Sequence, residues 1–124
     1  MSKTILVVDD SSTVRNLVAA TLKDDGFDVI EACDGVDALA KLNGNKIHLV
    51  VSDVNMPNMD GLTFVGKMKE KPEYKCVPVI MLTTEDNPVM RERGRTIGVT
   101  GWIVKPFDDA AIVSVVRRVT GARA

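Results

Sequence analysis

The chain reads ILVVDD at residues 5–10, a short apolar run that ends in two carboxylates. Three later runs share this design: LVVSD at residues 49–53, VIMLTT at residues 79–84 and WIVKP at residues 102–106. Each begins with apolar residues, mostly Val, Ile and Leu, and ends in polar or Pro residues. Such runs are typical of buried strands in a parallel sheet. The sequence therefore predicts a parallel sheet as the framework of the protein.

Polar side chains follow these runs where each predicted strand ends. In parallel sheets, ligands bind in the crevice beyond the carboxyl ends of the strands. If the runs are neighbouring strands, this crevice receives Asp9, Asp10, Asp53, Thr83 and Lys105. Three carboxylates packed together repel one another, so we expect them to need a cation. The sequence thus predicts a metal site, with Lys105 as a second, fixed positive charge.

The predicted ligands suit Mg²⁺, a hard cation that takes carboxylate, carbonyl and water oxygens and often a phosphate. Asp10 and Asp53 can supply carboxylates, and Asp9 can act through a water. The chain at Asn55 can turn a backbone carbonyl inward. The sequence therefore contains a full set of oxygen ligands close to one another in the predicted sheet.

Phosphoryl transfer is the chemistry that this cluster supports. A carboxylate held beside Mg²⁺ can attack a phosphoryl group. The metal and Lys105 would stabilise the spread charge of the transferring group, and Thr83 can donate its hydroxyl to one of its oxygens. Singly, each residue has a simpler interpretation: acidic capping of a helix for the Asp9-Asp10 pair, a turn for Asp53, a solvated surface position for Lys105. Their joint placement at strand ends favours a functional site.

Strand and helix patterns alternate along the whole chain without a linker. A fifth strand is predicted at residues 27–30, and the strands that contain the third and fourth runs are predicted at residues 77–82 and 101–104. The predicted helices begin at a cap at Ser11 or Ser12, at residue 35, after residue 61, at residues 87–88 and near Asp108. Helical spacing assigns these inward-facing residues: Val14, Leu17, Val18, Thr21 and Leu22; Val36, Leu39 and Leu42; Leu62, Val65 and Met68; Ile112, Val115, Val116 and Val119. Five such units predict an α/β fold, a doubly wound, flavodoxin-like five-stranded parallel sheet in the order 2-1-3-4-5, with helices on both faces.

Composition restricts the class of protein. The 124 residues fit one domain, residues 1–124, with 45% hydrophobic and 27% charged residues, as in ordinary globular proteins. The net charge of −1 gives no reason to expect nucleic acid or an anionic membrane as a partner. The sequence has no apolar stretch of membrane-spanning length and no signal-peptide pattern. Cys33 and Cys76 have no metal-ligand spacing and suggest no disulfide framework, so we expect a cytoplasmic, reduced protein. We also expect it to be a monomer.

The chain resembles the response regulator receiver family over its whole length. The resemblance rests on the motifs already quoted and on DVNMP at residues 53–57, Asp60-Gly61 and the KPF of residues 105–107. It implies that Asp53 is the phosphoacceptor, that Asp9, Asp10, Asp53 and the Asn55 carbonyl hold Mg²⁺, and that Lys105 contacts the phosphoryl group. It also implies that Thr83 is the switch hydroxyl, that Trp102 is the switch aromatic and that the Lys105-Pro106 peptide is cis. The domain would then catalyse its own phosphorylation and autodephosphorylation.

The LTTE of residues 82–85 and the GWIVKPF of residues 101–107 resemble the stand-alone chemotaxis (CheY) type, and no output domain is expected. That resemblance implies a sensor histidine kinase as donor, with a flagellar motor switch protein and a phosphatase as further partners. A phosphorelay intermediate and a phosphate sink outside chemotaxis stay open as alternatives.

Proteins of other classes fit the sequence less well. An aspartate-nucleophile phosphatase would carry a second acid two residues after the nucleophile, where Asn55 stands. A flavin-binding module would need a loop rich in Ser, Thr and Gly after the first strand, and Asp9-Asp10 there would repel its phosphate. A degenerate receiver acting only as a scaffold would not need the intact cluster.

Overall fold

The computed structural model describes residues 3–84 and 87–121, so Glu85, quoted above with its motif, lies outside the described residues. Within these described residues, five strands form one fully parallel sheet in the order β2-β1-β3-β4-β5, which confirms the predicted order. They are β1 (Thr4–Val8), β2 (Asp28–Ala32), β3 (Leu49–Asp53), β4 (Val79–Thr83) and β5 (Gly101–Val104). β2 continues two residues beyond the predicted end, and β4 begins two residues later than predicted, just after Pro78.

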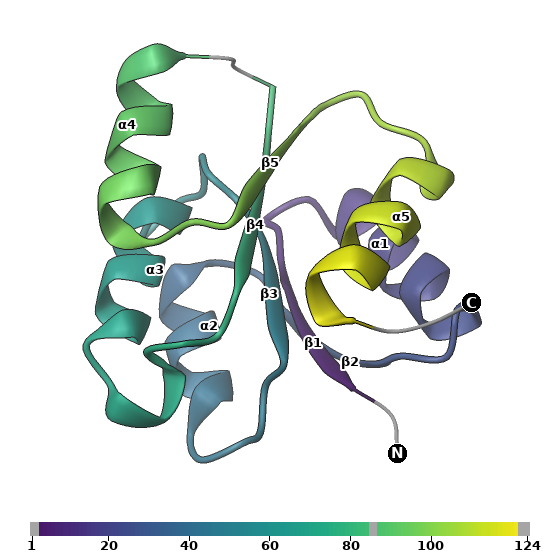
Figure 1. The fold of residues 1–124 in the computed structure, drawn as a ribbon, viewed down its shortest axis with the longest axis horizontal. Helices are drawn as coiled ribbons and strands as arrows, with labels where there is room; N and C mark the ends of the chain where they lie inside the picture. Colours follow the sequence, from purple (N-terminus) through teal and green to yellow (C-terminus); the bar gives the residue numbers. More distant parts are fainter. Residues whose placement is uncertain (1–2, 85–86, 122–124) are drawn as a thin grey trace.

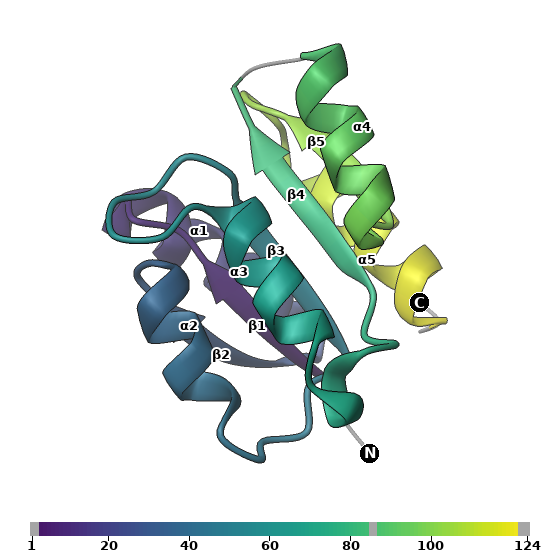
Figure 2. The same cartoon turned by 90° about the vertical axis from the view of Figure 1, so that its left-hand side faces the viewer.

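Helices cover both faces of the sheet, as expected for a doubly wound fold (Figure 1). On one face lie α1 (Ser12–Asp24) and α5 (Asp109–Thr120). On the other, α2 (Gly35–Leu42), α3 (Gly61–Lys69) and α4 (Pro88–Ile97) lie side by side (Figure 2). A short 3₁₀ helix, Pro72–Tyr74, which the sequence pattern did not predict, precedes β4. In the described part of the chain, no helix has the length and apolar character needed to cross a membrane.

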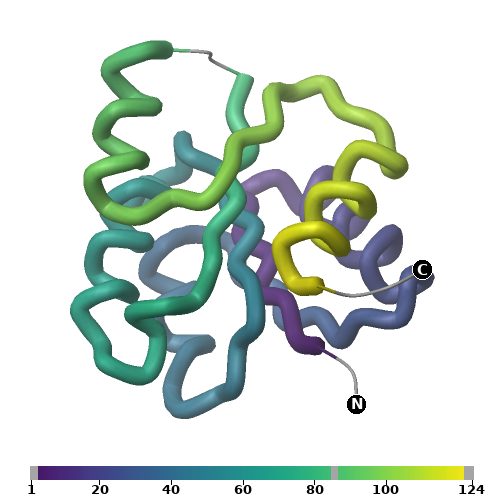
Figure 3. The backbone as a smooth tube through the Cα atoms, viewed as in Figure 1, coloured from purple at the N-terminus to yellow at the C-terminus, as the bar shows by residue number. Residues whose placement is uncertain are grey.

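Each α-helix begins with a side chain that accepts a hydrogen bond from a backbone N–H of its first turn. The capping residues are Ser11, Asp34, Asp60, Asn87 and Asp108. Such caps satisfy amide groups that have no partner within the helix. Because each of these α-helices follows a strand, the caps gather at the carboxyl edge of the sheet, where the candidate residues lie. The backbone trace shows the β5–α5 connection crossing this edge to reach the opposite face (Figure 3).

The core consists of two apolar layers, one on each side of the sheet. Alternate strand residues contribute to opposite layers: Leu6, Val50 and Met81 pack against the α2–α3–α4 side, and Ile80 and Leu82 against the α1–α5 side. This is the period of two that a strand imposes on its side chains.

Most of the predicted inward-facing helix residues are buried, but the prediction is wrong for Leu17 and Val36. Their side chains are 51% and 52% exposed. Leu17 precedes buried Val18 by one residue and is therefore turned by about 100° around the helix axis. The narrow buried face of α1 is already filled by Val18, Ala19 and Leu22. Val36 follows buried Gly35 with the same rotation in α2.

Two glycines of α3 should respond to alanine in opposite directions. A Cβ at Gly61 would lie 2.0 Å from the carbonyl oxygen of Asp53, whereas a Cβ at Gly66 would meet no atom within 4 Å. Gly61→Ala should therefore lower the free energy of unfolding by about 1–3 kcal/mol through overpacking. Gly66→Ala should raise it by about 0.5–1 kcal/mol through helix propensity. Urea denaturation of both variants measures this, and equal effects would contradict the close packing of α3 under β3.

Candidate functional site

Three carboxylates meet at the carboxyl edge of the sheet, as predicted. Asp9 and Asp10 directly follow β1, and Asp53 is the last residue of β3. The β1–β3 pairing places Val8 opposite Ser52, so the two strands end side by side. One carboxylate oxygen from each of the three residues lies within 4.8 Å of the others. Asp9 and Asp53 are buried, with 1% and 9% of their surface exposed, whereas Asp10 is exposed.

Lys105 brings the predicted positive charge into this cluster. Its Nζ lies 3.2 Å from Asp9 Oδ2 and 3.3 Å from Asp53 Oδ2. Its backbone N–H donates to the carbonyl of Thr83 at 2.7 Å, which fixes the β5–α5 connection beside the end of β4. The Lys105–Pro106 peptide is cis, as the resemblance implied. Among the described residues, this one ammonium contacts two of the three clustered carboxylates, Asp9 and Asp53, so the cluster retains excess negative charge.

Backbone and side-chain donors fix the orientation of the buried carboxylates. Asp9 Oδ1 accepts a hydrogen bond from the Ser11 N–H at 2.9 Å, and Asp53 Oδ1 accepts one from the Val54 N–H at 2.8 Å. The Arg15 guanidinium donates to the Asp9 carbonyl at 2.8 Å, a contact that the sequence pattern did not predict. In both carboxylates the other oxygen, Oδ2, is left to face Lys105.

Burial raises the pKa of the Asp53 carboxyl above its ordinary value. The neighbouring Asp9 raises it further, and Lys105 together with the Val54 N–H opposes the shift only in part. The site thus favours placing a proton or a cation on Asp53. The donors are all oxygens and carry excess negative charge, which fits a hard divalent cation such as Mg²⁺.

Thr83 and Trp102 lie on the neighbouring strands β4 and β5. Thr83 ends β4 and is 1% exposed. Trp102 pairs with Met81, two residues before Thr83, so by strand alternation Thr83 belongs to the face on which Trp102 packs. The predicted switch pair therefore shares one side of the sheet.

Two residues of α4 accommodate the indole of Trp102. The Arg91 guanidinium lies 5.5 Å from the centre of the indole ring, within the range of a cation–π interaction. A Cβ at Gly94 would come within 2.5 Å of Trp102 Cζ2. Gly94 thus provides the space for the indole, and sequence spacing gave no signal of this contact because the two residues lie on different elements.

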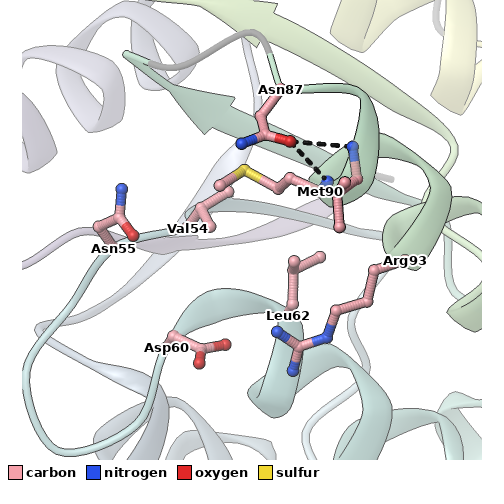
Figure 4. A pocket seen from close by; sticks show the side chains of 8 residues that line it. Val54, Asn55, Asp60, Leu62, Asn87, Met90 and Arg93 are labelled. Atoms are coloured by element: carbon pink, nitrogen blue, oxygen red, sulfur yellow. Dashed lines mark hydrogen bonds between the residues drawn. The ribbon is translucent and has the colours of Figure 1, made fainter.

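A cavity of about 260 Å³ lies between the start of α3, the start of α4 and the loop that follows β3 (Figure 4). Val54, Leu62 and Met90 give it apolar walls, and Asn55 lies at one side. Three of its polar residues have partners: Asp60 caps α3, Asn87 caps α4, and Arg93 Nη2 donates to Thr63 Oγ1 at 3.2 Å. The cavity adjoins the residue after Asp53 and is lined by none of the three clustered carboxylates.

Comparison with known proteins matches the family model described as the response regulator receiver domain to residues 5–117. Protein PilG of Pseudomonas aeruginosa is 34% identical over 113 residues, which cover 91% of this chain and 84% of that protein. Chemotaxis protein CheY1 of Helicobacter pylori is 43% identical over 105 residues, or 83% of this chain and 85% of that protein. The solved structure of Vibrio cholerae chemotaxis protein CheY4 superposes with a TM-score of 0.93 at 41% identity and covers 96% of this chain and 99% of its own.

The raised pKa of Asp53 predicts how stability depends on pH when no metal is added. Because the folded pKa exceeds the unfolded one, the stability that Asp53 contributes is full below the unfolded pKa and is lost as pH rises through the folded pKa. Asp53→Asn removes this loss. The difference in unfolding free energy between Asp53→Asn and wild type should therefore shift in favour of the variant from acid to neutral pH. Urea denaturation in a chelator measures it, with Asp28→Asn, at an exposed position of β2, as the control for one lost charge. If this difference shifted instead in favour of wild type toward neutral pH, the result would contradict the raised pKa of Asp53.

Proposed function

The chain belongs to the response regulator receiver family, and from this premise we propose how its own residues carry out the switching that defines the family. It is a phosphorylation-dependent response regulator of a two-component system. We propose that residues 1–124 act as a single receiver and that Asp53 accepts the phosphoryl group. The observation that carries this assignment is the position of Asp53 Oδ2, 3.3 Å from Lys105 Nζ and beside two further carboxylates.

Each residue of the cluster has a distinct role in the proposed transfer. Mg²⁺, when bound, would be held by Asp10, Asp53, the Asn55 carbonyl and Asp9, directly or through a water, and would supply positive charge for the phosphoryl oxygens. The Val54 N–H holds Asp53 Oδ1, which leaves Oδ2 as the attacking atom. Lys105 Nζ, which lies 3.3 Å from this oxygen, can then pair with the negative charge of the incoming phosphoryl group.

The proposed donor is a phosphohistidine of a sensor kinase. Asp53 Oδ2 forms a bond to phosphorus while the phosphorus–nitrogen bond breaks, and the electron pair returns to the imidazole, which then takes a proton from water. Hydrolysis of the resulting acyl phosphate would reverse the signal and would account for autodephosphorylation. Burial of Asp53 limits the access of water to this bond.

The relatives named above support chemotaxis as the process in which the protein acts. We propose a chemotaxis-type histidine kinase as donor and a flagellar motor switch protein as target, with a phosphatase as a further partner. The outer face of α4, β5 and α5 is the proposed output surface, because it carries Trp102 and the cations Arg91 and Arg118. A role as phosphorelay intermediate or phosphate sink would use the same phosphoacceptor with a different partner.

The output proposal depends on Thr83 and Trp102. A phosphoryl group on Asp53 offers new acceptor oxygens near the end of β4, and a shift of Thr83 toward them would change the space on the face where Trp102 packs. The half-buried indole would then turn inward, away from Arg91. A partner that selects the inward state would bind the phosphorylated protein more tightly.

Phosphorylation without a kinase tests the phosphoacceptor. Acetyl phosphate with Mg²⁺ should add one phosphoryl group to the protein, because the receiver itself contains the residues that promote transfer. Asp53→Asn should abolish the mass increase, and Asp10→Asn should lower its rate at least about tenfold by weakening metal binding. Asp28→Asn should react like wild type. Intact-protein mass spectrometry gives the result, and wild-type labelling of the Asp53 variant would refute the assignment.

Trp102 fluorescence tests the switch. Phosphorylation should change the emission of Trp102, the one tryptophan of the chain, as the indole leaves the Arg91 contact and becomes more buried. Thr83→Ala should still accept phosphate but should lose most of this change. If the Thr83 variant is phosphorylated and shows the full wild-type change in emission, coupling between Thr83 and Trp102 is not the mechanism.

A further inference from the structure

The loop between β3 and α3, residues 54–60, is attached at its middle to the turn between β2 and α2. Asn58 Nδ2 donates to Asp34 Oδ2 at 2.8 Å. Next to it, the Gly35 N–H donates to the Met59 carbonyl at 3.3 Å. This loop carries Asn55, whose carbonyl is the proposed metal ligand. The two hydrogen bonds therefore connect a ligand-bearing segment to an element that contributes no ligand itself.

Asp34 is a buried carboxylate outside the cluster described above. It is 8% exposed, and both of its oxygens are engaged. Oδ1 accepts from the Asp37 N–H at 2.8 Å and caps α2, while Oδ2 accepts from Asn58. These hydrogen bonds lower the pKa of Asp34, the Asp37 N–H contributing most. An ionised carboxylate accepts stronger hydrogen bonds than a neutral group, which makes the bridge between α2 and the loop a firm one.

The backbone on both sides is shaped for this contact. A Cβ at Gly35 would lie 2.8 Å from Met59 Cβ, so only glycine permits the approach of α2 to the loop. Asn58 has a φ of 67°, a left-handed conformation that asparagine tolerates better than most residues. The side-chain amide of Asn58 and its backbone conformation thus serve the same bridge.

The same turn also supports the other ligand-bearing segment. The Asp9 N–H donates to the Ala32 carbonyl at 3.1 Å, two residues before Asp34. Residues 32–35 consequently contact both the segment with Asp9 and Asp10 and the segment with Asn55. Without the Asn58 bridge, the loop would still be held by the Gly35–Met59 hydrogen bond and near its ends, by Val54 N–H to Leu82 O at 3.2 Å and Gly61 N–H to Val54 O at 2.8 Å, but residues 55–58 would lose the side-chain contact that holds them to the turn.

We propose that Asp34 and Asn58 are positioning residues for the metal site, acting through the loop that carries Asn55. This inference rests on the proposed function, since it takes the Asn55 carbonyl as a ligand. Loss of the Asn58–Asp34 contact lets residues 55–58 sample more conformations, so binding Mg²⁺ must restore order that the native contact already provides. Loss of such an outer contact typically weakens metal binding by about 10- to 100-fold, and we expect the lower end of this range because the direct ligands stay in place.

Asn58→Gly is the decisive variant, because glycine keeps the left-handed backbone conformation and removes only the amide. Asn43→Gly is the matched control: Asn43 is the other described asparagine with positive φ, and it lies at the far end of α2. Mg²⁺ titration of the unphosphorylated proteins by calorimetry should give a dissociation constant about tenfold higher for Asn58→Gly. Asn43→Gly should bind like wild type.

Asp34→Ser separates the bridge from the helix cap. Serine keeps an acceptor for the first turn of α2, because it caps about as well as aspartate, but it is too short to reach Asn58. It should weaken Mg²⁺ binding as Asn58→Gly does, and the double variant should be little worse than either, because both remove one interaction. In acetyl phosphate reactions, both variants should need more Mg²⁺ for half-maximal rate and should approach the wild-type rate at saturating Mg²⁺. A purely structural role of these residues would leave the Mg²⁺ concentration for half-maximal rate unchanged.

The outcomes separate this inference from the function on which it rests. If the wild-type protein binds Mg²⁺ and Asn58→Gly binds it with the same affinity, the positioning role is overturned and the phosphoacceptor assignment stays intact. Failure of wild type to bind Mg²⁺ at millimolar concentration would overturn the metal site and the positioning role together. Equal weakening by Asn43→Gly and Asn58→Gly would also overturn it, because the effect would then come from backbone flexibility alone.

Discussion

Repulsion among three carboxylates at one edge of the sheet is the constraint around which the site is built. Folding buries Asp9 and Asp53 close together, which raises the pKa of Asp53 and would be unfavourable without a positive charge nearby. Lys105 meets part of this cost by contacting both carboxylates. Its partner Asp9 lies 96 residues away in the sequence, so the contact exists only when β1, β3, β4 and β5 are assembled. The negative charge that Lys105 leaves uncompensated favours a cation at this site, which is what the proposed phosphoryl transfer requires.

Much of this arrangement could be predicted from the sequence, because a parallel sheet converts chain position into spatial position. Asp9, Asp53 and Thr83 each end or directly follow an apolar run, and the carboxyl ends of parallel strands lie at one edge. Periodicity alone does not determine the strand order, and the order 2-1-3-4-5 was predicted from the doubly wound arrangement of five strand–helix units. The outward turn of Leu17 and Val36 was missed because an apolar spacing of three or four residues fits several neighbouring helix faces, and only the packed structure selects one.

Contacts between elements far apart in the sequence could not be predicted from the spacing of residue types. Asp34 and Asn58 are 24 residues apart, and each has an ordinary local explanation, a helix cap for one and a turn for the other. Gly94 has no side chain whose pattern could be recognised, and its role appears only when Trp102 is seen to lie against it. Such residues are determined by how closely two elements approach, which depends on the shapes of all the side chains between them.

The contacts that hold the site differ between its two sides, and this difference affects where a charge added to Asp53 could cause movement. On the side of β1 and β2, hydrogen bonds from residues 32–35 and from Arg15 hold Asp9 and the loop after β3. On the side of β4 and β5, the Lys105 N–H holds the Thr83 carbonyl, but the indole of Trp102 packs against Gly94 and makes a cation–π contact with Arg91, and these two contacts are less directional than hydrogen bonds to a carboxylate. A new phosphoryl group on Asp53 has to be accommodated by movement of its neighbours, and the less directional contacts of the indole resist movement less than hydrogen bonds to a carboxylate do. This difference supports the proposed response at Thr83, Trp102 and α4, in which the proposed metal-binding side keeps its geometry.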